Sequence, residues 1–290
     1  MSAALLEYAN DPSVRHVLGI SGGKDSAALA IYIRQRYPKI HDRVEYFFTD
    51  TGAELPEVYQ FLDKLEAVLG KEIVRLNSGK TFEEWLEAHN KFLPSPKQRW
   101  CTRAMKIKPF EEFIGNDPVI SYVGIRADED REGYISQKDT IKPVFPFIED
   151  GIVRADVFQI LEDTVGIPEY YQWRSRSGCY FCFFQRQDEW LGLKEHHPEL
   201  FEKAKEFENM ERQKYDWKDG EVAIPNTGYT WSSQGTIDEA VVRAEKARAK
   251  KRLQEDGVIG SSKATERWQD IFKREDDLDA DEQACGICSL

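Results

Sequence analysis

The feature that most constrains the fold is an alternation of short apolar runs with segments of helical period along the first 165 residues. Parallel strands need a long crossover connection, usually a helix, so this alternation is typical of a parallel sheet with helices on its faces. The pattern predicts strands at 17–20, 44–49, 73–76 and 119–125, and helices at 27–37, 57–69, 82–89 and 150–166. We therefore predict an α/β fold, a twisted parallel sheet with helices on both faces.

The chain changes character after Pro168, where it becomes aromatic, charged and helical, with no further strong strand signal. A good helix former follows at 237–254. We predict two parts: a nucleotide-binding α/β domain over 1–168, and a mainly helical, cysteine-containing subdomain with a C-terminal tail over 169–290.

Charge and composition limit the classes of partner. The 290 residues include 40 Lys and Arg against 52 Asp and Glu, a formal net charge of −12, which opposes autonomous binding to nucleic acid. Any polyanion would therefore need a local basic patch or a partner protein. No apolar run approaches the roughly 20 residues of a membrane helix, and the first ten residues lack the pattern of a secretory signal. We expect a cytoplasmic protein without a membrane segment.

The sharpest local motif is Ser21-Gly22-Gly23-Lys24-Asp25-Ser26, between the first expected strand and the first expected helix. Glycines let backbone N–H groups approach an anion, and the positive end of the helix dipole points to the same place. An aspartate beside a phosphate implies a divalent cation, so Mg²⁺ is expected. The spacing differs from a Walker A loop and from a dinucleotide fingerprint. An ordinary strand-to-helix turn is the alternative.

The motif resembles the PP-loop of the ATP pyrophosphatase superfamily, which cleaves ATP between its α and β phosphates. Asp50-Thr51-Gly52 and Gly124-Ile125-Arg126, with Glu129 and Arg131 after it, resemble motifs of the branch similar to phosphoadenylyl-sulfate (PAPS) reductase. The resemblance implies an adenine nucleotide α-hydrolase-like fold. It assigns catalysis to Lys24, Asp25, Arg126 and Arg131, and ATP binding to Ser21, Gly22, Gly23, Lys24, Asp25, Ser26, Asp50, Thr51, Gly124 and Arg126. Surface salt bridges are the alternative for the segment around Arg126.

Five cysteines, four of them in Cys-x-x-Cys pairs, suit metal or redox chemistry in a reducing compartment. The resemblance implies a [4Fe-4S] cluster on Cys101, Cys179 and Cys182, with Cys285 or Cys288 as a candidate fourth ligand. A Zn²⁺ site formed by the two Cys-x-x-Cys pairs is the alternative. The aromatic residues around Cys179 and Cys182 are expected to shield a cluster or to pack in a core.

Together, an intact phosphate loop and this cysteine pattern resemble the ATP pyrophosphatase subunits of bacterial DNA phosphorothioation systems, of the SspD and DndC kinds. That resemblance implies a sulfurtransferase that takes sulfur from a cysteine desulfurase, works with the other phosphorothioation subunits and forms a homodimer. The alternatives are a phosphoadenylyl- or adenylyl-sulfate reductase, a tRNA thiolase, and a non-catalytic nucleotide sensor with a zinc site.

Overall fold

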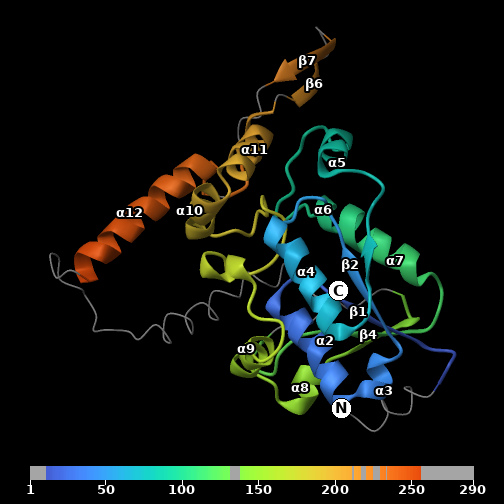
Figure 1. The fold of residues 1–290 in the computed structure, drawn as a ribbon. Helices are drawn as coiled ribbons and strands as arrows, with labels where there is room; N and C mark the ends of the chain where they lie inside the picture. Colours follow the sequence, from blue (N-terminus) through green and yellow to red (C-terminus); the bar gives the residue numbers. More distant parts are fainter. Residues whose placement is uncertain are drawn as a thin grey trace.

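The computed structural model describes residues 11–130, 138–210, 212–216, 220–224, 229–232 and 234–255 (Figure 1). Its centre is a five-stranded sheet in the order β3-β2-β1-β4-β5, and every neighbouring pair is parallel. The strands are β1 (Arg15–Gly19), β2 (Val44–Thr49), β3 (Ile73–Leu76), β4 (Val119–Tyr122) and β5 (Ile141–Val144). The predicted parallel α/β fold is confirmed.

Side chains alternate between the two faces of the sheet, as the pleat requires. Leu18 of β1 and Phe48 of β2 join the larger buried cluster, which contains residues of α2 (Lys24–Arg36), α4 (Pro56–Leu69) and α9 (Arg154–Glu162). Val17 and Phe47, their neighbours in sequence, join a smaller cluster on the opposite face, where α7 (Lys108–Ile114) packs. Both faces are therefore covered by helices, which explains why the central strands are almost entirely buried.

The described residues add the following elements: α3 (Pro38–His41), α5 (Phe82–Ala88), α6 (Trp100–Thr102), the π-helical turn η1 (Arg103–Ile107), α8 (Pro146–Asp150), the 3₁₀ turn η2 (Glu169–Gln172), α10 (Gln187–His196), α11 (Pro198–Asn209), β6 (Arg212–Asp216), β7 (Gly220–Ile224) and α12 (Ile237–Glu255). α10 packs against both α11 and α12. None of the helices in the described ranges is long and apolar enough to cross a membrane.

Three expectations about these elements were wrong. The helix expected at 150–166 is the shorter α9, Arg154–Glu162, because Gly151 has a positive φ of 71° and separates it from α8, which ends at Asp150. Strand β5 was missed because Lys142 and Pro143 interrupt its apolar character, which an edge strand tolerates. The expectation of no strand after Pro168 also failed: β6 and β7 form an antiparallel hairpin that extends beyond α11, away from the sheet (Figure 1).

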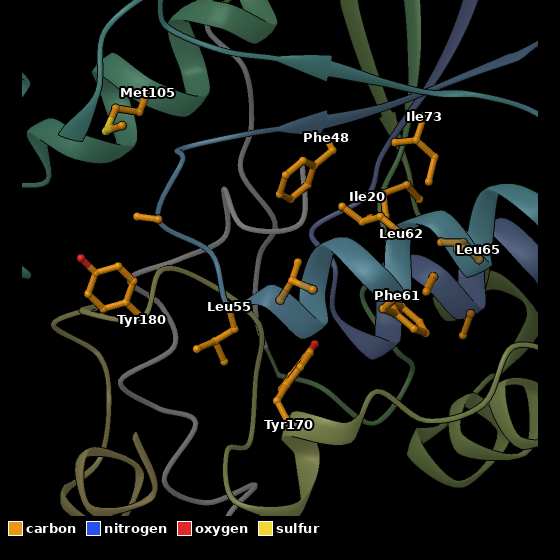
Figure 2. Close-up of a cluster of buried hydrophobic side chains, with 14 of the residues drawn as sticks. Ile20, Phe48, Leu55, Phe61, Leu62, Leu65, Ile73, Met105, Tyr170 and Tyr180 are labelled. Atoms are coloured by element: carbon orange, nitrogen blue, oxygen red, sulfur yellow. The ribbon is translucent and has the colours of Figure 1, made fainter. Parts of the chain in front are cut away.

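The segment after Pro168 shares the core of the sheet domain. Tyr170 and Tyr180 belong to the same buried cluster as Leu55 and Phe61, which lie just before and within α4 (Figure 2). Aromatic contacts extend the cluster, since the ring of Phe181 lies 4.0 Å from that of Phe82, centroid to centroid. Burial of each such side chain contributes about 1.5–3 kcal/mol, so this packing fixes the later segment against the loops that follow β1 and β2.

Candidate functional site

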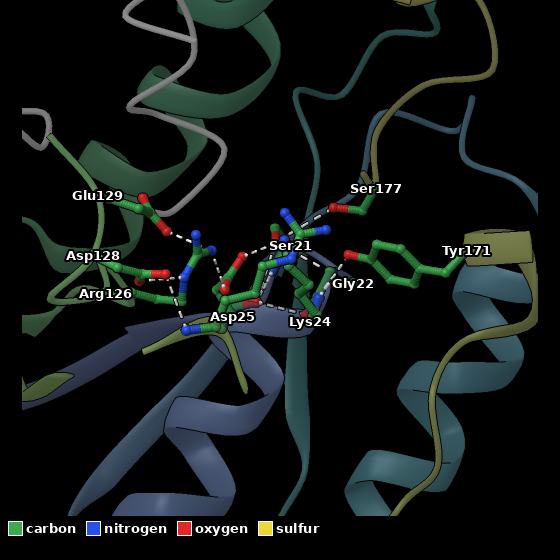
Figure 3. Close-up of polar contacts among 12 residues, drawn as sticks. Ser21, Gly22, Lys24, Asp25, Arg126, Asp128, Glu129, Tyr171 and Ser177 are labelled. Atoms are coloured by element: carbon green, nitrogen blue, oxygen red, sulfur yellow. Dashed lines mark hydrogen bonds and ion pairs between the residues drawn. The ribbon is translucent and has the colours of Figure 1, made fainter. Parts of the chain in front are cut away.

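The strand order reverses at β1, because β2 and β3 lie on one side of it and β4 and β5 on the other. In open parallel sheets, ligands bind at such a switch point, beyond the carboxyl ends of the strands. The loop 21–23 follows β1 and the segment 124–126 follows β4, so the fold brings together two of the three predicted nucleotide motifs (Figure 3). A Cβ on Gly124 would lie 3.1 Å from the backbone oxygen of Asp25. Glycine at position 124 therefore lets the segment after β4 approach the start of α2 closely.

The loop after β1 has a conformation that requires glycine. Gly22 has a φ of +77°, and a Cβ there would lie 2.5 Å from Cγ1 of Val58. Ser26 closes the loop from inside α2, because its Oγ accepts the Ser21 N–H at 3.0 Å and lies 3.1 Å from the Ser21 Oγ. Gly23 is the N-cap residue of α2, and no side chain caps the helix from that position. The first amides of α2 therefore face the crevice at the switch point.

A network of charges surrounds the loop. The Asp25 carboxylate accepts from the Lys24 ammonium and from Nη1 of Arg126, each at 3.0 Å. Arg126 is 3% exposed; its Nε donates to Asp128 at 2.9 Å, and its Nη1 lies 2.6 Å from Glu129. Burial alone would raise the pKa of Asp25, yet Lys24 and Arg126 hold it below its usual value. Asp25 is therefore ionised at neutral pH.

The ion pairs of Asp25 bear on the predicted Mg²⁺ site. The position of Asp25 beside a phosphate implied Mg²⁺, but in the structure both of its oxygens are already paired with cations. A carboxylate of this kind suits Mg²⁺, which proteins hold through one or two carboxylates together with phosphate oxygens. Each Asp25 oxygen has a second lone pair, so an ion bound there would share the carboxylate with Lys24 or Arg126. Arg131 lies outside the described residues.

The segment after Pro168 also contacts the loop. The Tyr170 hydroxyl donates to the Gly22 carbonyl at 2.7 Å, and the Tyr171 hydroxyl accepts the Lys24 N–H at 2.9 Å. Ser177 adds its Oγ, 3.5 Å from the Ser21 Oγ. Core packing was expected for these tyrosines, and Tyr170 does pack there. Sequence reasoning missed their contacts with the loop, since no spacing relates residues almost 150 positions apart.

The turn after β2 contacts Cys179. Asp50 shapes that turn, because its Oδ1 accepts the Gly52 N–H and the Tyr59 hydroxyl, each at 2.8 Å. The Thr51 hydroxyl lies 3.2 Å from the Cys179 sulfur and donates to Glu54 at 2.9 Å. The structure thus places Thr51, one of the predicted ATP-binding residues, in contact with Cys179.

Cys101 and Cys182 lie in the same neighbourhood as Cys179. Burial raises the pKa of Cys101 to about 11, and the electrostatic effect of Cys182 adds to it. Burial likewise raises the pKa of Cys179, with Glu54 adding to the shift. Lys106, on η1, is close enough to interact with all three cysteines and with Glu54. Burial alone would lower the pKa of Lys106, but the interactions with these four side chains raise it. The thiols of Cys101 and Cys179 are therefore protonated at neutral pH.

These cysteines do not form a preformed metal site. Within the described ranges, no three His, Cys, Asp or Glu side chains are arranged to hold a metal ion. Cys285 and Cys288, the candidate further ligands, lie outside those ranges. The residues present therefore do not by themselves fit a [4Fe-4S] cluster or a Zn²⁺ ion.

Two buried charged residues, both missed at the sequence level, hold the loop that carries Cys179. Arg174, 2% exposed, donates to the carbonyls of Gly178 and Cys179 at 3.0 and 2.8 Å. Glu189, 1% exposed, accepts the N–H groups of Ser175 and Arg186 at 2.7 and 2.9 Å. Because burial of unpaired charges is costly, these bonds fix the backbone on both sides of the Cys-x-x-Cys pair.

The sheet domain is similar to a known family of domains. Residues 15–143 match the family model of the phosphoadenosine phosphosulfate reductase domain. These residues are therefore similar to a PAPS reductase domain. This domain includes the phosphate loop, Cys101 and Arg126, and it ends before Tyr171 and Cys179. The match agrees with the resemblance noted in the sequence.

Two relatives from Methanocaldococcus jannaschii match beyond that domain. The chain is 30% identical over 197 residues to the uncharacterized protein MJ0973, covering 63% of this chain and 45% of the relative. It is 29% identical over 210 residues to the uncharacterized protein MJ0066, covering 68% of this chain and 41% of the relative. The chain therefore spans less than half the length of these two relatives.

A solved structure also matches, the phosphate complex of PAPS reductase from Candida auris. The TM-score is 0.44 at 15% sequence identity, over 58% of this chain and 82% of the other.

Proposed function

We propose that the protein is an ATP pyrophosphatase that adenylates a substrate for sulfur incorporation, with DNA phosphorothioate modification as the most specific candidate. The observation that carries this proposal is the pair Lys24 and Arg126, which converge on Asp25 at the switch point of the sheet. The complete Ser-Gly-Gly-x-Asp-Ser loop supports cleavage of ATP by this domain rather than binding alone.

In this proposal the phosphates of ATP lie on the first amides of α2. An oxygen of the acceptor attacks the α phosphorus, forming an oxygen–phosphorus bond, and the bond from that phosphorus to the bridging oxygen of pyrophosphate breaks. Lys24 and Arg126 stabilise the charge that develops on the leaving pyrophosphate. A bound Mg²⁺ would neutralise part of the same charge. The products are the adenylated acceptor and pyrophosphate.

The cysteine neighbourhood supports a sulfur-transfer step beside the phosphate loop. Thr51 follows β2 and contacts Cys179, while Ser177 on the same loop as Cys179 lies next to Ser21. A cysteine desulfurase would transfer sulfur to one of these thiols as a persulfide. The outer sulfur would bond to the activated atom of the acceptor, and the bond from that atom to the adenylated oxygen would break, so that AMP leaves with the oxygen. A second cysteine thiol would then cleave the remaining S–S bond, and a small thiol reductant would reduce the resulting disulfide. With a net charge of −12, the chain would reach DNA through other phosphorothioation subunits.

A second candidate is a phosphoadenylyl- or adenylyl-sulfate reductase, and the match of residues 15–143 to the reductase family model favours it. In this reaction the bound sulfonucleotide is itself the substrate. The same loop and the same cations would hold its phosphates.

The deciding experiment measures pyrophosphate and phosphate release from Mg·ATP by the purified chain, with and without a cysteine desulfurase. Asp25→Ala is the test variant, and Asp63→Ala, whose carboxylate side chain is 76% exposed, is the matched control. We expect pyrophosphate release that the Asp25 variant loses and the Asp63 variant keeps. Turnover of a sulfonucleotide without pyrophosphate release from ATP would support the reductase instead.

The metal content is measured separately. A cluster on Cys101, Cys179 and Cys182 would need a further ligand, such as Cys285 or Cys288. Anaerobic purification that yields about four iron and four sulfide per chain would support the cluster. Stoichiometric zinc without iron would replace it with the zinc alternative, and neither metal would leave the sulfur step to the thiols.

A further inference from the structure

The amide of Lys24 is the first in α2, and its N–H donates to the Tyr171 hydroxyl at 2.9 Å (Figure 3). First-turn amides have no partner within their own helix and are the donors that bind anions at helix N-termini. The Tyr171 oxygen therefore occupies the position that a phosphate oxygen would take on this amide.

Tyr171 also lies against the cation of the loop. Nζ of Lys24 is 5.8 Å from the centroid of the Tyr171 ring while it pairs with Asp25 at 3.0 Å. Burial raises the pKa of Tyr171, so its hydroxyl is neutral. As a neutral acceptor of the hydrogen bond from the Lys24 N–H, it is a weak substitute for an anion. The Tyr171 side chain thus lies against both the backbone N–H and the ammonium of Lys24, the two groups that would bind a phosphate.

The neighbouring Tyr170 has a different relation to the loop. Its hydroxyl donates to the Gly22 carbonyl at 2.7 Å, and a carbonyl oxygen does not bind anions. Tyr170 is fully buried and supports the shape of the loop. Two adjacent tyrosines therefore offer a matched pair, in which one hydroxyl competes with an anion and the other does not.

The segment that carries Tyr171 continues directly to the cysteines. Three residues after Tyr171, the Arg174 guanidinium donates hydrogen bonds to the carbonyls of Gly178 and Cys179. Ser177 contacts Ser21 on the loop itself. A displacement of Tyr171 would therefore act on the backbone that positions Cys179.

We infer that the Tyr171 hydroxyl is an internal occupant of the anion position, that a nucleotide phosphate must displace it, and that this displacement loosens the segment 170–182. The inference rests on the proposed function in one respect, that the loop binds the phosphates of a nucleotide. It adds a coupling between phosphate binding and the cysteine loop, and such a coupling is reciprocal.

The first test compares Tyr171→Phe with Tyr170→Phe. Affinity for pyrophosphate and for α,β-methylene ATP, each with Mg²⁺, is measured by calorimetry on the full chain. We expect Tyr171→Phe to bind about two- to tenfold more tightly than the unsubstituted protein, because the net contribution of the competing hydrogen bond is lost. Tyr170→Phe should bind equally or more weakly. Equal or weaker binding by Tyr171→Phe overturns the inference alone, whereas no binding by any of the three proteins overturns the proposed function as well.

The second test needs no variant. Hydrogen exchange of the unsubstituted protein is followed with and without Mg²⁺-pyrophosphate, which has no adenine or ribose to contact the segment. We expect faster exchange in peptides from 170–182 and no change in peptides from α12. Unchanged or slower exchange in 170–182, with pyrophosphate binding established by calorimetry, overturns the coupling to the cysteine loop.

Discussion

The guanidinium of Arg126 lies 3.0 Å from the carboxylate of Asp25, although 101 residues separate them in the chain. The contact exists because β1 and β4 are neighbours in the sheet, so that the loops after them meet. Arg126 also pairs with Asp128 and Glu129. A single buried cation therefore pairs with three carboxylates at the edge of the phosphate loop.

Removal of this cation should destabilise the fold and abolish pyrophosphate release. Arg126→Ala removes a cation that three carboxylates share, and loss of one partner from a buried pair costs about 3–5 kcal/mol. Arg248→Ala removes an exposed cation that pairs with Glu195, and there we expect a loss of about 0–1 kcal/mol. Urea unfolding of both variants checks the difference. Equal losses in the two variants would contradict the structural role of Arg126.

The pKa of Asp25 gives a pH dependence with a definite sign. Lys24 and Arg126 outweigh the effect of burial, so the folded-state pKa lies below the unfolded value of 3.8. A depressed carboxyl pKa contributes stability that is fully present above the unfolded pKa and is lost as the pH falls through the folded value. The unfolding free energy of the unsubstituted protein minus that of Asp25→Asn should be constant above about pH 5 and shrink in acid. A difference that stays constant below pH 3.8 would contradict the shift.

Glycine at position 22 should be essential for stability for two reasons, its positive φ and its closeness to Val58. Gly52, which shares only the positive φ, serves as the control. Gly22→Ala forces a side chain into a positive φ and brings its Cβ 2.5 Å from Val58. Gly52→Ala meets the same kind of backbone, at a φ of +69°, but has nothing within 4 Å. We expect a loss of about 1–2 kcal/mol at position 52 from the backbone, and a further loss of about 1–3 kcal/mol at position 22 from the clash.

Thermal or urea unfolding measures both glycine variants. Val58→Ala, added to Gly22→Ala, should recover part of the additional loss because it removes the clashing methyl groups. If the double variant is no more stable than the sum of the two single changes predicts, the clash does not explain the loss.

The reactivity of Cys101 follows from its raised pKa. Because burial moves that pKa to about 11 from the 9.0 of an ordinary thiol, alkylation by iodoacetamide should be slow near pH 8 and still increase above pH 9. Mass spectrometry of Cys101-containing peptides measures the rate in folded and urea-unfolded protein. A rate profile that levels off at the same pH in both states would contradict the prediction, and protection at every pH would indicate a bound metal.

Local signals in the sequence predicted most of the sheet domain. The strands 44–49 and 73–76 agree with β2 and β3, since each is a short apolar run between turn residues. The end of α4 at Leu69 was predicted from Gly70, which adopts the left-handed conformation. The phosphate loop was found for the same reason, because strand, glycines and helix are consecutive in the chain. Short-range spacing and backbone conformation carry such information.

Tertiary structure decided which of these segments meet. It placed Arg126 on Asp25, Thr51 beside Cys179 and the Tyr171 hydroxyl on the Lys24 amide. It also brought Lys106, which follows Cys101 by five residues, close enough to interact with Cys179 and Cys182. The sequence by itself determined the local elements and the residue types of the site. The partners of those residues depend on strand order and on the packing of one buried cluster, which are properties of the whole folded chain.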